Sequence, residues 1–118
     1  MHDGSPVNVA AFETTVHAGA HADAPLHYHA DGASAAEVAL DAYLGPCQVI
    51  DAVGCGEVLT RAFVEQFVPT PARRVLFRTF ERFPHDAWPA AFTAVDAGAI
   101  DYLASRGVIL IGGHPADL

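Results

Sequence analysis

The chain has 118 residues, with 14 acidic against 6 basic side chains and a formal net charge of −8 at pH 7. All the basic residues are Arg, which excludes Schiff-base and P-loop chemistry because both need Lys, and no basic stripe is available for a nucleic-acid backbone. No apolar run is long enough to cross a bilayer, and the first residues lack the pattern of a signal peptide. We therefore expect a cytoplasmic protein without nucleic-acid or membrane partners.

The first half of the chain predicts two strands. Residues 6–16 are rich in β-branched side chains and partly alternate, which favours a strand. Asp31 and Gly32 form a turn signal, and residues 37–45 fit a short helical turn that ends in a glycine. The second strand is expected over residues 47–53, and it leads into a glycine-rich turn.

Two helices are predicted in the second half, each preceded by a residue that can cap it. Thr60 precedes a helix over 61–68, and Asp96 precedes a helix over 97–106 that ends at a glycine. Apolar side chains recur every fourth residue along the first helix and predict its buried face. They are Leu59, Phe63 and Phe67.

Further strands are predicted over residues 74–80 and 108–111. The second is a continuous apolar run, which is typical of a strand buried on both faces. Because strands and helices alternate along the chain, we predict a layered α/β domain.

A histidine-rich run follows the first predicted strand. His17, His21, Asp23 and His27 are all odd-numbered, so an extended backbone would place them on one face, and every even position from 18 to 24 is Ala. Two imidazoles and a carboxylate suit zinc or another borderline divalent metal. His17, His21 and Asp23 supply the three ligands of a catalytic site, and His27 is placed to act as general acid/base.

The other histidines are assigned less specific roles. His2, His29 and His85 are interpreted as surface residues, and His114 is left undecided. A serine nucleophile is disfavoured because no Ser lies in a Gly-x-Ser-x-Gly elbow.

The run His17-x-Gly-x-His-x-Asp-x-Pro-x-His27, followed by the aromatic Tyr28, resembles the signature of the cyclase-like metal hydrolases, in particular bacterial kynurenine formamidase (arylformamidase). Similar stretches extend the resemblance over nearly the whole chain; they are residues 4–9, 24–28, 40–47 and 106–112. Ala20 stands where this family usually has Thr. Family members are also longer at both ends and add a later His and Glu to the metals, so we expect residues 1–118 to be a single, partial domain, truncated at both ends.

The resemblance implies a β/β/α swivelling fold, a homodimer, and one or two zinc ions, with Mn or another divalent metal as substitutes. It implies hydrolysis of N-formylkynurenine to kynurenine and formate in tryptophan degradation by the kynurenine pathway. By motif position, His17, His21 and Asp23 are metal ligands, and Asp23 can bridge two metals. His27 is then the catalytic acid/base that protonates the leaving aniline nitrogen.

Three alternatives remain open. The first keeps the chemistry and changes the substrate to another linear or cyclic amide. The second is a truncated, non-catalytic homologue that binds metal. The third is a cupin-like barrel, suggested by His27-Tyr28-His29, and it is disfavoured because the nearest following Glu is Glu37.

Overall fold

The computed structural model describes residues 7, 9–82 and 89–113. The chain divides into two compact units, Met1–Val38 and Ala39–Leu118. Within the described ranges, all the strands and α-helices lie in the second unit, and the first unit holds a single 3₁₀ helix, Pro25–His27. None of the helices in the described part of the chain has the length and apolar content that a membrane span requires.

The second unit is built on parallel strands. Its larger sheet has the order β1-β3-β5, formed by Gln48–Asp51, Arg74–Arg78 and Leu110–Gly113. A smaller parallel sheet pairs β2 (Val58–Leu59) with β4 (Ala94–Val95). Parallel neighbours need crossover connections, and the α-helices lie in these connections. The prediction of an α/β arrangement is confirmed.

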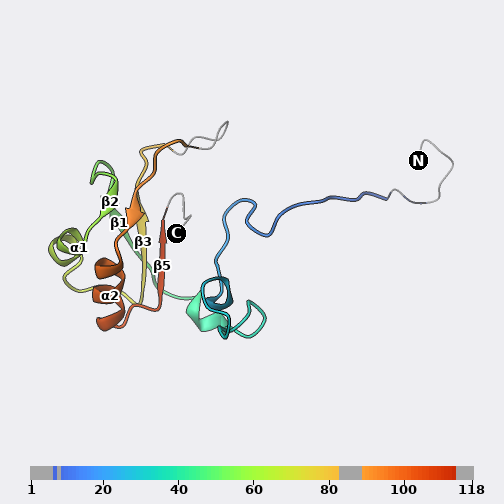
Figure 1. The fold of residues 1–118 in the computed structure, drawn as a ribbon, viewed down its shortest axis with the longest axis horizontal. Helices are drawn as coiled ribbons and strands as arrows, with labels where there is room; N and C mark the ends of the chain where they lie inside the picture. Colours follow the sequence, from blue (N-terminus) through green and yellow to red (C-terminus); the bar gives the residue numbers. More distant parts are fainter. Residues whose placement is uncertain (1–6, 8, 83–88, 114–118) are drawn as a thin grey trace. The chain divides into compact units, whose positions relative to one another are not determined.

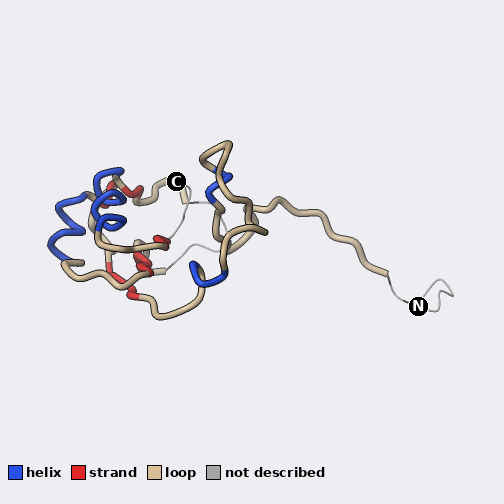
Figure 2. The backbone as a smooth tube through the Cα atoms, turned by 90° about the horizontal axis from the view of Figure 1, so that it is seen from below, coloured by secondary structure: helices blue, strands red, loops and turns tan. Residues whose placement is uncertain are grey.

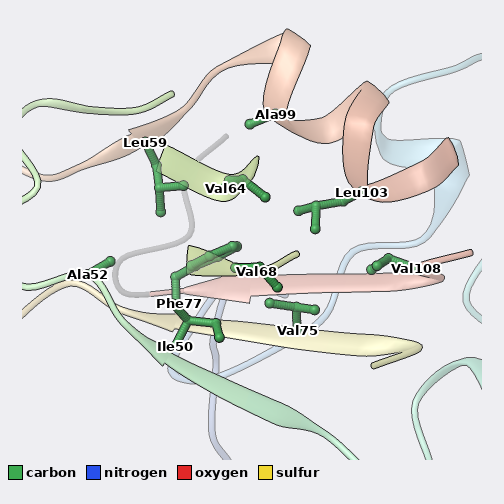
Figure 3. Close-up of a cluster of buried hydrophobic side chains, with 10 residues drawn as sticks. All are labelled: Ile50, Ala52, Leu59, Val64, Val68, Val75, Phe77, Ala99, Leu103 and Val108. Atoms are coloured by element: carbon green, nitrogen blue, oxygen red, sulfur yellow. The ribbon is translucent and has the colours of Figure 1, made fainter. Parts of the chain in front are cut away.

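The helices α1 (Arg61–Phe67) and α2 (Ala97–Ser105) lie on one side of the three-stranded sheet (Figure 1). Figure 3 shows the core between them, where side chains from the helices meet side chains from β1 and β3. Ile50 and Phe77 are register partners and both are buried. The full set of buried apolar residues is Ile50, Ala52, Leu59, Val64, Val68, Val75, Phe77, Ala99, Leu103 and Val108.

Both helix caps form as predicted. The Thr60 side chain accepts a hydrogen bond from the backbone N–H of Phe63 at 3.3 Å. One oxygen of Asp96 accepts from the N–H of Gly98 at 2.6 Å, and the other accepts from the N–H of Arg61 at 3.3 Å. The Asp96 carboxylate therefore caps α2 and also binds the first turn of α1.

The predicted strand over residues 6–16 is wrong for its described part, which forms no strand (Figure 2). Val9, Phe12 and Val16 are 87%, 90% and 84% exposed. A β-branched segment becomes a strand only when a neighbour binds its backbone and covers one face. In the described ranges of the first unit, this segment has no strand partner, and its large apolar side chains stay exposed.

The buried face of α1 agrees with the prediction only in part. Leu59 is fully buried and Phe63 packs half-buried against the core, as predicted, whereas Phe67 is 53% exposed and contacts the ring of Phe63. Val64 and Val68, which were not predicted for this face, are fully buried. The strand predicted at 108–111 begins later, at Leu110, and is only half-buried because it lies at the edge of its sheet.

Arg74 is a buried cation in β3, with 5% of its surface exposed. Its guanidinium donates to the carbonyl oxygens of Asp41 and Ala42, in the 3₁₀ helix Leu40–Ala42 that confirms the predicted helical turn. A Cβ on Gly45 would lie 2.7 Å from the same guanidinium. Arg74 therefore ties this loop to the sheet, and the carbonyl groups offset the cost of burying its charge.

We expect Asp96→Ala to destabilise the second unit by about 1–3 kcal/mol, because two backbone N–H groups lose a charged acceptor. Urea unfolding followed by circular dichroism measures the change. Asp101→Ala removes an exposed carboxylate from the same helix and is the matched control. Equal midpoints for the two variants would contradict the double role of Asp96.

Candidate metal centre

A chain reversal within the first unit sets the position of the histidines. The N–H of Ala18 donates to the carbonyl of Thr15 at 3.2 Å, and the N–H of His17 donates to the Thr15 hydroxyl at 3.4 Å. Gly19 follows with φ of +71°, a left-handed conformation that favours glycine. The backbone therefore turns between His17 and His21.

This turn brings three ligand atoms together. Nδ1 of His17 lies 3.0 Å from Nε2 of His21. Oδ1 of Asp23 lies 3.6 Å from that Nδ1 and 3.7 Å from that Nε2. In the described ranges, these residues are the one group of three or more His, Cys, Asp or Glu side chains suited to holding a metal ion.

The extended backbone expected for this run is wrong. In a strand, residues four apart are separated by about 13 Å, so side chains on one face would lie in a row rather than converge. The turn at Gly19 shortens the path between the two imidazoles and lets Asp23 reach both.

The hydrogen bond of His21 fixes which of its ring nitrogens faces the cluster. Nδ1 of His21 lies 2.9 Å from the carbonyl oxygen of Gly19. Since a carbonyl can only accept, Nδ1 carries the proton and Nε2 is left with a free lone pair. Metal-ligating histidines commonly bind a backbone carbonyl in this way, because it orients the ring and fixes the tautomer.

The proton between the two histidines follows from this assignment. Nε2 of His21 accepts, so Nδ1 of His17 is the donor across the 3.0 Å contact. A metal ion bound at these two nitrogens would take the place of that proton, and the His17 proton would then reside on its other ring nitrogen. Metal binding at these two nitrogens would therefore require a change of tautomer at His17.

The spacing of the three atoms fits a tetrahedrally bound divalent metal such as zinc. Bond lengths of about 2.0–2.2 Å in a tetrahedron place two ligand atoms about 3.4 Å apart. The observed separations of 3.0, 3.6 and 3.7 Å bracket that value. The side chains are 38%, 24% and 23% exposed, in the order His17, His21 and Asp23, so solvent reaches the cluster within this unit.

His27 reaches the cluster by a different local structure. Pro25 opens a 3₁₀ helix, Pro25–His27, whose last residue is the predicted acid/base. The ring centroid of His27 lies 4.8 Å from that of His17 and 4.7 Å from that of Tyr28. Its imidazole therefore lies beside the ligands.

Of the remaining histidines, only His29 lies among the described residues. His29 is exposed, its Nδ1 accepts from the N–H of Asp31 at 3.3 Å, and it is not part of the group of converging ligand atoms. His2, His85 and His114 lie outside the described residues.

Two features of the site were not predicted from sequence. The Gly19 carbonyl carries no side-chain signal, although the lone glycine among alternating alanines marks the turn that exposes it. The edge-on contact of Tyr28 with His27, at an interplanar angle of 86°, depends on the 3₁₀ turn that places neighbouring rings together.

A comparison with known families matches most of the chain. Residues 2–115 match the model of the Cyclase family, which is described as "Putative cyclase". The matched range spans parts of both units and includes His17, His21, Asp23 and His27.

We expect Asp23→Asn and His21→Ala each to weaken zinc binding, because each removes a proposed ligand. Loss of a residue that only supports a ligand lowers metal affinity by about 10–100-fold, and the loss here should be larger. Competition with a chromogenic chelator measures the affinity. His29→Ala is the matched control, since it removes a nearby imidazole outside the cluster. Equal zinc affinity in all three variants would show that zinc binds elsewhere.

Proposed function

Since the chain belongs to the Cyclase family, we propose that it is a zinc-dependent amide hydrolase of the arylformamidase type. The proposed reaction converts N-formylkynurenine to kynurenine and formate. The observation that supports it most is the convergence of His17, His21 and Asp23, with the His27 imidazole in ring contact with His17.

A divalent metal at this cluster would polarise the substrate carbonyl and lower the pKa of a bound water. In the proposal the residues of the chain bind the metal and orient its ligands. His17 and His21 contribute neutral nitrogens, and the Gly19 carbonyl holds the His21 ring in its orientation. Asp23 supplies the negative charge that a divalent cation requires.

Amide hydrolysis also needs a proton at the leaving nitrogen. Water adds its oxygen to the formyl carbon, the C–N bond breaks, and the nitrogen leaves as an amine only after it gains a proton. In the proposal His27 takes a proton from the attacking water and delivers one to this nitrogen. Its position at the end of a short helix beside the ligands suits both transfers.

The proposed substrate rests on the resemblance of the sequence to bacterial kynurenine formamidase, and the ligand cluster alone fits several amides. A metal-loaded chain that cleaves other linear or cyclic amides but not N-formylkynurenine would keep the hydrolase and change its substrate. A chain that binds zinc tightly and cleaves no amide would overturn the enzymatic proposal and favour a metal-binding homologue.

We expect His27→Gln to lower kcat by about 10²–10⁴-fold while zinc remains bound, because a general acid/base is lost and no ligand is removed. The assay follows the loss of N-formylkynurenine by absorbance, with zinc measured on the same sample. His29→Gln makes the same change two residues away and should retain the wild-type rate. A His27→Gln protein with unchanged kcat would remove His27 from the mechanism.

A further inference from the structure

The backbone that carries His27 forms a closed loop. The N–H of Leu26 donates to the carbonyl of Ala33 at 3.1 Å, which joins the two ends of the loop. The N–H of His29 donates to the carbonyl of Pro25 at 3.0 Å, and the N–H of Gly32 donates to that of His29 at 2.8 Å. Residues 24–33 therefore hold their conformation through their own main-chain hydrogen bonds.

Gly32 makes the closest approach in this loop. A Cβ built on Gly32 would lie 2.5 Å from the carbonyl carbon of Pro25, 2.6 Å from its oxygen and 2.7 Å from the nitrogen of Leu26. All three are main-chain atoms, and they belong to the turn that ends at His27. They cannot swing aside as the end of a flexible side chain can.

The need for glycine here is one of space rather than of backbone conformation. Gly32 is not among the glycines with positive φ. Gly19 presents the opposite case, because it has a positive φ and a Cβ built on it would meet no atom within 4 Å. The two glycines thus serve two separate parts of the site, the ligand turn and the loop that carries the acid/base.

We propose that Gly32 is a positioning residue, whose missing side chain lets the loop close and hold the His27 imidazole beside the metal ligands. The effect of Gly32 on catalysis rests on the proposed function, whereas its effect on the position of His27 rests on the loop geometry alone. Any side chain at this position forces the segments around Pro25 and Gly32 apart. The hydrogen bond from Leu26 to Ala33 then breaks, and the turn ending at His27 loses its anchor.

The ligand turn should survive this change. His17 and His21 precede the loop, and they are held by the hydrogen bonds to Thr15 and Gly19. Opening the loop thus separates His27 from a cluster that still binds metal. A residue that merely stabilised the first unit would reduce both properties together.

The experiment compares Gly32→Ala with Gly113→Ala. The control adds the same methyl group where the nearest atom, the carbonyl oxygen of Phe77, lies at an ordinary 3.4 Å. Three quantities are measured on the full chain with zinc: the affinity for zinc, kcat and KM for N-formylkynurenine, and the His27 Hε1 chemical shift. That proton signal is assigned by its loss in His27→Gln, and it senses the neighbouring rings of His17 and Tyr28.

For Gly32→Ala we expect unchanged zinc affinity, a kcat lower by about a hundredfold, as for a misplacement of about 1 Å, and a His27 signal shifted towards that of a free histidine. Gly113→Ala should match the wild type in all three. The inference is overturned if the His27 signal stays in place, if zinc affinity falls in parallel with kcat, or if the variant unfolds. The chemical shift and the zinc affinity decide the question even if the wild-type chain cleaves no amide, so the two proposals fail separately.

Discussion

At Gly19 the main chain takes a left-handed conformation, with φ of +71°, and this reversal sets the geometry of the whole ligand cluster. It shortens the path between His17 and His21 until their ring nitrogens lie 3.0 Å apart. It also places the Gly19 carbonyl within hydrogen-bond distance of Nδ1 of His21, the ring nitrogen that does not face His17. A residue with a Cβ is destabilised by about 1–2 kcal/mol in this conformation, so glycine is favoured here.

A second backbone constraint complements the first. Gly32 lies against the Pro25–Leu26 peptide, and this close approach lets the loop over residues 24–33 close. That loop contains the 3₁₀ helix Pro25–His27. The candidate metal ligands and His27, the proposed acid/base, are therefore held by separate local structures a few residues apart. Each depends on main-chain hydrogen bonds within the segment rather than on burial in an apolar core. A short stretch of exposed chain can in this way assemble several titratable side chains.

The sequence predicted which side chains come together better than how the backbone brings them together. Residue types and spacing singled out His17, His21 and Asp23, whose donor atoms converge in the structure, and the neighbouring His27. The same spacing suggested an extended strand, since alternation is the simplest way to place side chains on one face. Only the conformation of Gly19 distinguishes a row of side chains from a cluster, and that conformation is not encoded by periodicity.

The fold shows a similar division. Thr60 and Asp96 were predicted as caps because a single side chain beside a helix start determines the interaction, and the α/β class followed from the alternation of elements. The segment at 6–16 was predicted wrongly, and the buried face of α1 was predicted correctly for Leu59 but not for Phe67, which is 53% exposed. Both outcomes depend on which neighbour covers the side chain. Sequence signals were therefore reliable where the interaction partner lies within a few residues along the chain.

X-ray absorption at the zinc edge of the metal-loaded chain tests the central claim most directly, because it reports the atoms around the metal. The structure predicts a shell of nitrogen and oxygen at about 2.0–2.2 Å, with the outer scattering of two imidazole rings. Sulfur at about 2.3 Å would place the metal on Cys47 or Cys55 instead. Either that distance or a spectrum without imidazole scattering would contradict a metal centre at His17, His21 and Asp23.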